Sequence, residues 1–157
     1  TPDRPLSMVG QAPLDSAQEK EIHSFFLDRY GHGLQPILEE HQLMLWQSRA
    51  GIFAVPVAYL DYFSGLPCQL LGLKLADRAG DELVPAHDWV TRFGSNFTIG
   101  RLVIPPEFLP LWLRGEDLEL ATNNIGVVIL FDSDGRCLGR GRALGGKIKN
   151  LLPGRLV

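Results

Sequence analysis

Cysteine is scarce in this sequence. Cys68 and Cys137 are its only cysteines, they stand far apart, and no C-x-x-C pair occurs. Two isolated thiols argue against a disulfide framework and against a cysteine-ligated zinc site. Three histidines are spaced by nine residues, which matches no familiar metal-ligand pattern, so we interpret them as unrelated surface residues: His23, His32 and His41. The sequence therefore predicts no metal, and its thiols suit a reducing cytoplasm.

Long apolar runs are also missing. No window of about 18 apolar residues is free of charge, so the sequence predicts no membrane-spanning helix. No secretory signal is visible at the N-terminus. Apolar residues make up 45% and charged residues 21% of the 157 residues, which indicates a folded chain with a sizeable core. This length suits one mid-sized domain or two small ones.

Catalytic groupings are absent as well. No Ser/His/Asp set or pair of carboxylates stands out, and Asp132 and Asp134 are better explained by a turn. Residues 141–148 nearly spell the phosphate-binding pattern G-x-x-x-x-G-K-[ST]. However, Ile148 replaces the hydroxyl residue, and the ten residues after Lys147 leave no room for the helix that would hold a phosphate. We therefore expect no catalytic residue in this chain.

Apolar periodicity and turn residues predict many short elements. Asp15-Ser16 offers an N-cap for the first helix, and Glu19 stands three residues after Ser16 as in a capping box. Helices are predicted at residues 17–30, 34–41, 58–63, 85–93 and 105–113. Strands are predicted at residues 43–47, 51–55, 68–76, 99–104, 118–120, 125–131 and 136–143. Residues 132–135 have the composition of a hairpin turn between the last two strands.

These elements predict an α+β chain of two small domains. Residues 1–15 hold three prolines and no periodicity, so they are expected to form a linker or arm. Residues 16–95 are predicted to form an α/β accessory domain. The pattern changes near residues 94–98, and the short strands with one helix that follow predict a small mixed β-barrel at residues 96–157.

Positive charge is concentrated at the C-terminal end. Residues 136–157 contain six basic residues and no acid, whereas the rest of the chain has a net charge of −9. Such asymmetry indicates an anionic partner, most often nucleic acid phosphate. The alternative is a solvated basic strand face. Glycines in the same stretch favour a binding function, because they let another molecule approach the backbone.

The C-terminal residues carry a recognisable pattern: Leu138-Gly139-x-Gly141-x-x-x-Gly145-Gly146-x-Ile148-Lys149-Asn150-x-x-Pro153-x-x-Leu156. It resembles the end of the PUA-like RNA-binding domain of Nop/Sun-type RNA cytosine-5 methyltransferases, with the ribosomal small-subunit methyltransferase F family as the closest bacterial group. Residues 111–116 resemble the helix end Y-L-R-G-E of that family. Residues 51–55, 66–75 and 84–87 resemble its preceding small domain.

The resemblance implies the C-terminal, RNA-binding region of an S-adenosylmethionine-dependent RNA methyltransferase. Such a region would position a methyltransferase domain, supplied in cis, on structured RNA, either rRNA or tRNA. The methyl donor would bind in that catalytic domain, so we expect no cofactor in this chain. The start at Thr1 instead of Met and the proline-rich arm suit a piece of a longer protein.

The expected RNA-binding residues lie in the basic stretch. Those expected to contact phosphates are Arg136, Arg140, Arg142, Lys147, Lys149 and Arg155, and those expected to allow close approach of the RNA backbone are Gly139, Gly141, Gly145 and Gly146. Asn150 is expected either to hydrogen-bond RNA or to cap a turn. The rival functions are a protein-interaction module, a stand-alone RNA-binding protein and a small enzyme.

Overall fold

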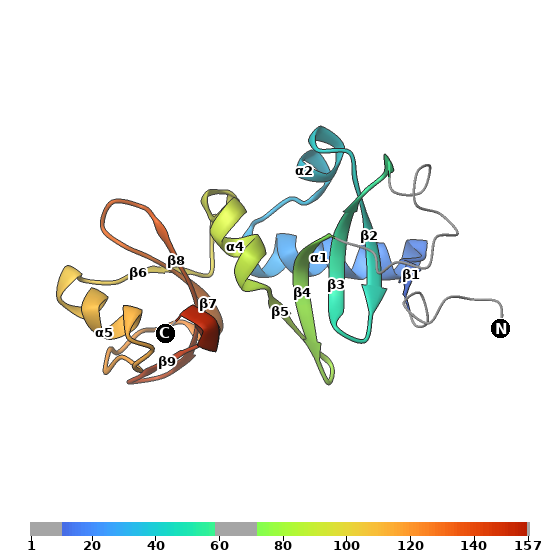
Figure 1. The fold of residues 1–157 in the computed structure, drawn as a ribbon. Coiled ribbons are helices and arrows are strands. Elements are labelled where there is room, and N and C mark those ends of the chain that lie inside the picture. Colours follow the sequence, from blue (N-terminus) through green and yellow to red (C-terminus); the bar gives the residue numbers. More distant parts are fainter. Residues whose placement is uncertain (1–10, 59–71, 157) are drawn as a thin grey trace. The chain divides into compact units, whose positions relative to one another are not determined.

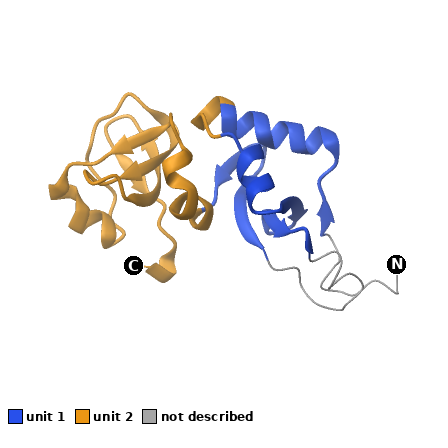
Figure 2. Ribbon diagram, turned by 90° about the horizontal axis from the view of Figure 1, so that it is seen from above, with its two compact units in different colours: residues 1–27, 33–86 blue, residues 28–32, 87–157 orange. Residues whose placement is uncertain are grey.

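The computed structural model describes residues 11–58 and 72–156. The chain divides into two compact units (Figure 2): unit 1 comprises residues 1–27 and 33–86, and unit 2 comprises residues 28–32 and 87–157. Residues 87–95, expected in the accessory domain, group with unit 2. The functional division into an accessory and an RNA-binding domain stays a prediction. None of the helices within the described ranges is both long and apolar enough to cross a membrane.

Unit 1 contains an antiparallel sheet in the order β1-β2-β3-β4-β5 (Figure 1). Its strands are β1 (Ala12–Pro13), β2 (Leu43–Ser48), β3 (Gly51–Pro56), β4 (Leu73–Ala79) and β5 (Glu82–Pro85). The order follows the sequence because short turns join β2 to β3 and β4 to β5. Ile22, Phe26 and Leu75 are completely buried in the core of unit 1.

The described part of unit 1 also contains the helices α1 (Ser16–Tyr30), whose last three residues belong to unit 2, and α2 (Gln35–Glu40). The predicted capping box of α1 was placed one residue too late. The main-chain N–H of Asp15 donates to Gln18 Oε1 over 2.9 Å, and the N–H of Gln18 donates to Asp15 Oδ1 over 2.8 Å. Asp15 is therefore the N-cap, and a glutamine closes the box as well as the expected Glu19 would.

Unit 2 contains a sheet in the order β6-β7-β8-β9. Its strands are β6 (Arg101–Val103), β7 (Ile125–Phe131), β8 (Cys137–Leu144) and β9 (Ile148–Asn150). Strand β6 is parallel to β7, and the other pairs are antiparallel. In the described residues this sheet does not close, so the expected barrel is not confirmed. Its helical segments are α4 (His87–Phe93), α5 (Leu109–Leu113) and the 3-10 turns η2 (Gly94–Asn96), η3 (Pro106–Phe108) and η4 (Gly154–Leu156).

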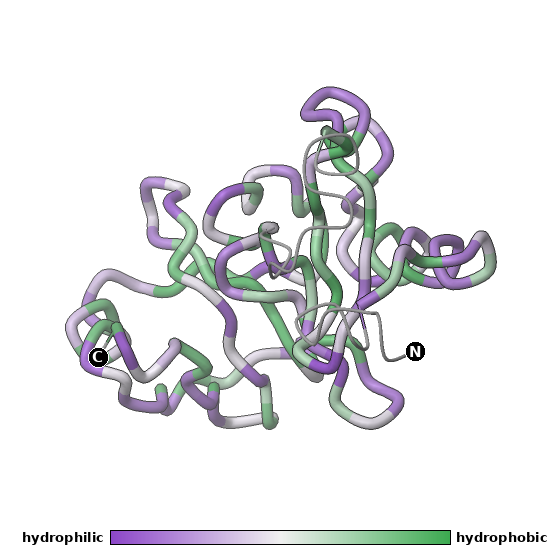
Figure 3. Tube along the Cα trace, turned by 45° about the vertical axis from the view of Figure 1, so that its right-hand side comes forward, coloured by the Kyte–Doolittle hydropathy of each residue, from purple (hydrophilic) through white to green (hydrophobic). Residues whose placement is uncertain are grey.

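Strand β7 is the centre of unit 2. Residues 127–131 are each no more than 3% exposed, although adjacent side chains of a strand point to opposite faces. Both faces of β7 are therefore covered, which agrees with the continuous apolar run seen in the sequence. One face packs into a cluster that includes Ile104, Trp112, Leu118, Val128, Leu130, Ala143 and Ile148. In Figure 3 the strands are mostly coloured as hydrophobic and the connecting loops as hydrophilic.

His32 is buried, and the expectation that it lies on the surface was wrong. Its ring stacks on Phe97 with the centroids 4.5 Å apart, and its Nε2 accepts a hydrogen bond from Trp89 Nε1 over 3.0 Å. Burial lowers the pKa of His32 to about 4, because the charged imidazolium would lose its water. The histidine is thus a neutral part of the core of unit 2.

Other differences concern short elements. Strands β1, β5 and β9, which have two to four residues each, were not predicted. Strand β4 extends to Ala79, three residues beyond the predicted strand at 68–76, and the strand expected at 118–120 is a single bridge between Leu118 and Ile148. Most of the predicted helix at 58–63 and the first residues of the predicted strand at 68–76 lie outside the described residues.

Candidate nucleic-acid interface

Successive side chains of β8 point to opposite faces of the sheet. Gly141 and Ala143 are buried in the core, whereas Arg142, between them, is only half-buried and must point to the other face. Strand β9 pairs with β8 so that Lys149 lies directly opposite Arg142. Two like charges at opposite positions repel each other. This cross-strand pair therefore places two positive charges at neighbouring positions of the sheet.

The turn between β8 and β9 exposes its backbone. The N–H of Leu144 donates to the main-chain oxygen of Lys147 over 2.9 Å, which closes the turn around Gly145 and Gly146. Both glycines are exposed, and a Cβ atom added to either would meet no atom within 4 Å. These two glycines therefore leave open space in which another molecule can approach the main chain.

Lys147 is tied to the same end of the sheet by an acid. Its Nζ lies 3.4 Å from Asp117 Oδ2, and the lysine side chain remains 45% exposed. The other oxygen of Asp117 accepts the main-chain N–H of Asn150 over 2.8 Å. That hydrogen bond, together with Lys147 and Lys149, lowers the pKa of Asp117. The acid stays ionised and balances part of the lysine charge.

Arg136, Arg155 and Arg140 have internal partners within unit 2. Arg136 contacts Asp132 at 2.7 Å and Asp134 at 3.4 Å within the hairpin turn, and the hydrogen bond from its main-chain N–H lowers the pKa of Asp132. Arg155 pairs with Asp88 at 3.1 Å. Arg140 donates to the main-chain oxygen of Leu151 over 2.8 Å. Residues 136–157 contain no acid, but in the folded chain acids from other parts of the sequence lie beside Arg136 and Arg155.

Charge nevertheless differs between the units. Unit 2 carries ten basic and eight acidic residues, a net charge of +2, whereas unit 1 has a net charge of −5. The basic side chains that the structure brings together are Arg142, Lys147 and Lys149. We call this set, together with Gly145 and Gly146, the basic turn surface. Arg136 lies apart from this set because it pairs with Asp132 and Asp134 in the β7–β8 turn. Arg155 also lies apart, because it pairs with Asp88 of α4.

Gly139 and Gly141 are explained by internal packing. A Cβ on Gly141 would come within 2.6 Å of the Ile148 side chain and 2.9 Å of Leu130. Gly139 has a φ of +100°, and its Cβ would lie 3.2 Å from His87 Nδ1. Both glycines are buried. The space that they leave is thus filled by the protein itself, unlike the space beside Gly145 and Gly146.

Asn150 caps a turn. Its side-chain nitrogen donates to the main-chain oxygens of Trp112 and Glu116, each over 3.0 Å, and its side-chain oxygen accepts the N–H of Leu152 over 2.9 Å. Both amide hydrogens and the oxygen are therefore engaged within the protein. Of the two roles expected from the sequence, this geometry shows the structural one.

The comparison with known families concerns the same region. Residues 108–157 match the model of the methyltransferase RsmF PUA domain. These residues are thus similar to the PUA domain of that methyltransferase. The resemblance predicted from the C-terminal pattern is thereby confirmed.

Curated relatives extend the similarity across the chain. The ribosomal RNA small subunit methyltransferases F of Escherichia coli strains K12 and SMS-3-5 are each 23% identical to it over 153 residues. The protein of strain HS is 22% identical over the same length. Each alignment covers 98% of this chain but 31% of the relative. The chain thus spans about a third of the length of the curated relatives that it matches.

Sequence reasoning missed two features of unit 2. Arg29 Nη2 donates to the main-chain oxygen of Ile125, a contact between residues 96 positions apart. Ile125 and Leu144 are 79% and 57% exposed and pair directly across β7 and β8. No local sequence pattern predicts the contact between Arg29 and Ile125. Ile125 begins the predicted strand at 125–131 and Leu144 directly follows the predicted strand at 136–143, so the apolar pair could have been noticed at the open end of the predicted hairpin.

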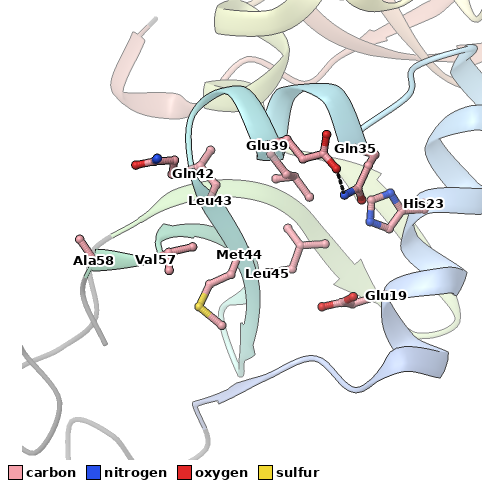
Figure 4. Close-up of a pocket in the computed structure, with 11 residues that line it drawn as sticks. Glu19, His23, Gln35, Glu39, Gln42, Leu43, Met44, Leu45, Val57 and Ala58 are labelled. Atoms are coloured by element: carbon pink, nitrogen blue, oxygen red, sulfur yellow. Dashed lines mark hydrogen bonds between the residues drawn. The ribbon is translucent and has the colours of Figure 1, made fainter. Parts of the chain in front are cut away.

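Unit 1 has a pocket of about 530 Å³ (Figure 4). Its polar side holds Glu19, His23, Gln35 and Glu39, and Gln35 Nε2 donates to Glu39 Oε1 over 2.8 Å. Its other lining residues include Leu38, Leu43, Met44, Leu45 and Val57. Among the described residues, no serine or cysteine lines the pocket, and no cluster of potential ligands would hold a metal.

Proposed function

We propose that this chain is the RNA-binding C-terminal region of an S-adenosylmethionine-dependent RNA (cytosine-5) methyltransferase. It positions a methyltransferase domain, supplied in cis, on structured rRNA or tRNA in the cytoplasm. The similarity to the RsmF PUA domain supports the RNA-binding part of this proposal. The relatives' name and their greater length support the catalytic part.

The observation that carries the proposal is the basic turn surface. Arg142 and Lys149 lie opposite each other, Lys147 stands two residues before Lys149, and the intervening turn exposes glycine backbone. Folded RNA is recognised largely through its shape, phosphates and 2′-hydroxyls. A cluster of cations beside accessible main-chain groups suits that type of contact. A barrel-like closure stays part of the proposal, and the bridge from Leu118 to Ile148 on β9 supports it.

The residues described here do not fit the methyl donor. The one exposed glycine-rich turn, at Gly145 and Gly146, is followed by strand β9 and not by a helix. A nucleotide-type cofactor would need the helix that follows such a loop in α/β folds. S-adenosylmethionine therefore belongs, in this proposal, to the catalytic domain alone.

The test compares RNA binding of three proteins at about 50 and 200 mM salt, using rRNA fragments and tRNA. They are the wild-type chain, the variant Lys147→Glu/Lys149→Glu, and the matched control Lys20→Glu/Arg49→Glu. The control changes the net charge by the same amount at exposed positions of unit 1. It separates a local contact from a general charge effect.

We expect wild type and control to bind with affinity that falls steeply with salt, because phosphate contacts release counterions. The lysine variant should bind at least about tenfold more weakly at low salt and with a shallower salt dependence. Equal losses in both variants would remove the basic turn surface from the proposal. Absence of binding by wild type would favour a protein-interaction module instead, whereas binding without any effect on methylation in the longer protein would favour an independent RNA-binding role.

A further inference from the structure

Two large aliphatic side chains stand together at the open end of the β7–β8 pair. Ile125 is 79% exposed and Leu144 is 57% exposed. Among the large hydrophobic residues that the structure describes, Ile125 is the most exposed. They occupy directly opposite positions in the register. Opposite Cβ atoms in an antiparallel pair lie about 4.5–5.5 Å apart, so the two side chains form one apolar surface.

Cations flank this surface on both strands. On the side of β8, the main-chain N–H of Leu144 donates to the main-chain oxygen of Lys147, so these two residues face each other across the turn; Lys147 Nζ lies 3.4 Å from Asp117 Oδ2. On the side of β7, the guanidinium of Arg29 is hydrogen-bonded to the main-chain oxygen of Ile125. The apolar pair is thus bordered by a lysine and by an arginine that come from distant parts of the sequence.

The position of Arg29 depends on Gly126. This glycine has a φ of +83°, and a Cβ added to it would come within 2.6 Å of Arg29 Nη2. The missing side chain lets the guanidinium lie against the strand. Because Arg29 is held in place before any ligand binds, a contact with a ligand costs less side-chain entropy than a freely moving arginine would require.

This combination fits a nucleotide better than it fits phosphate alone. Exposed aliphatic surface is unfavourable in water and gains nothing from a phosphate backbone. It does gain from the flat face of a nucleobase or ribose, while the flanking cations suit the adjoining phosphates. In a duplex the base faces are stacked inside, so they are accessible only in loops, bulges and ends.

We propose that Ile125 and Leu144, with Arg29 and Lys147 beside them, bind an unpaired nucleotide of the target RNA. This inference rests on the proposed RNA-binding function. The proposed function predicts salt-dependent affinity of the basic turn surface for RNA. The inference further predicts that RNA with unpaired nucleotides is preferred. The apolar pair holds the base or sugar, and the two cations hold the neighbouring phosphates.

The test uses an RNA hairpin with an unpaired loop and a perfect duplex of the same length and charge. Binding of the full chain is measured for wild type, Ile125→Ser/Leu144→Ser and the control Val103→Ser/Leu113→Ser. The control residues are also exposed, at 53% and 55%, and lie on β6 and α5. Circular dichroism and thermal unfolding establish that all three proteins are folded.

We expect wild type and control to prefer the hairpin, and the Ile125/Leu144 variant to lose about tenfold in hairpin affinity with the same salt dependence. Its duplex affinity should be unchanged. Equal hairpin affinity of variant and wild type, or equal wild-type affinity for both RNAs, would overturn the inference and leave the proposed function standing. If wild type bound neither RNA, the proposed function would fail together with it.

Discussion

The side-chain nitrogen of Asn150 donates a hydrogen bond to the main-chain oxygen of Trp112 over 3.0 Å. This bond links β9 to the end of α5, and Trp112 in turn donates from its indole to the main-chain oxygen of Leu138 over 2.8 Å. The buried indole and the asparagine therefore connect the helix to both C-terminal strands. A residue in the most basic part of the sequence holds unit 2 together.

Replacing Asn150 by alanine is expected to destabilise unit 2. The change removes three hydrogen bonds and leaves main-chain groups without partners, which should lower the free energy of unfolding by about 2–3 kcal/mol. Asn123→Ala, at an exposed asparagine of the same unit, should change it by less than about 0.5 kcal/mol. Urea unfolding of the two variants and wild type measures the difference.

The same variant separates the two roles expected for Asn150. At a temperature where Asn150→Ala is still folded, it should bind RNA like wild type, because its amide is engaged inside the protein. A loss of RNA affinity without a loss of stability would show that the amide contacts RNA.

The glycines of β8 and of the following turn are expected to differ in tolerance. Gly141→Ala would place a Cβ 2.6 Å from the Ile148 side chain, so it should cost about 1–3 kcal/mol of stability through overpacking. Gly146→Ala meets no atom within 4 Å and has no positive φ, so it should change stability by less than about 0.5 kcal/mol. Thermal unfolding of both variants tests this. Equal effects would contradict the assignment of Gly141 to the core.

Sequence patterns predicted the β7–β8 hairpin well because its information is local. An apolar run, an Asp-Ser-Asp-Gly turn and a return strand lie within twenty residues, and the turn forms with Asp132 accepting the N–H of Arg136 over 2.8 Å. Strand β9 gave no such signal. Its three residues are held by pairing with β8 and by the bridge to Leu118, which are properties of the folded chain.

The candidate site was predictable only as a set of charges. Counting basic residues found Arg142, Lys147 and Lys149, but the sequence does not show that Asp88 pairs with Arg155 across 67 positions. Nor does it show that Arg29 reaches Ile125. Which cations are available to a ligand depends on these long-range partners, and they are fixed by tertiary packing.

Gln42 is expected to be a site of local strain. It lies between α2 and β2 with a φ of +54°, the left-handed conformation that side chains with a Cβ disfavour. Gln42→Gly should raise the free energy of unfolding by about 0.5–1 kcal/mol, since the hydrogen bond from the N–H of Val57 to its main-chain oxygen is retained. Gln47→Gly, within β2, should lower it instead. Stabilisation by neither change in urea unfolding would mean that the turn is unstrained.

The buried His32 is expected to make stability depend on pH between about 6.5 and 4. In the folded protein its pKa is lowered to about 4, whereas in the unfolded chain it has the ordinary value of 6.5. Below 6.5 the unfolded chain therefore binds a proton that the folded chain does not, and the free energy of unfolding falls as the pH drops. The loss should reach about 3 kcal/mol near pH 4, and above 6.5 His32 should contribute no pH dependence.

His87 acts in the same direction, because burial and the nearby Arg140 also lower its pKa. Urea unfolding between about pH 7 and 4.5 for wild type, His32→Gln and His87→Gln separates the two contributions. His32→Gln keeps an acceptor for Trp89 but does not titrate, so its stability should vary less with pH than that of wild type. NMR should show the His32 ring protons unshifted down to about pH 5. A His32 resonance that titrated near 6.5 would contradict the burial of a neutral imidazole between Trp89 and Phe97.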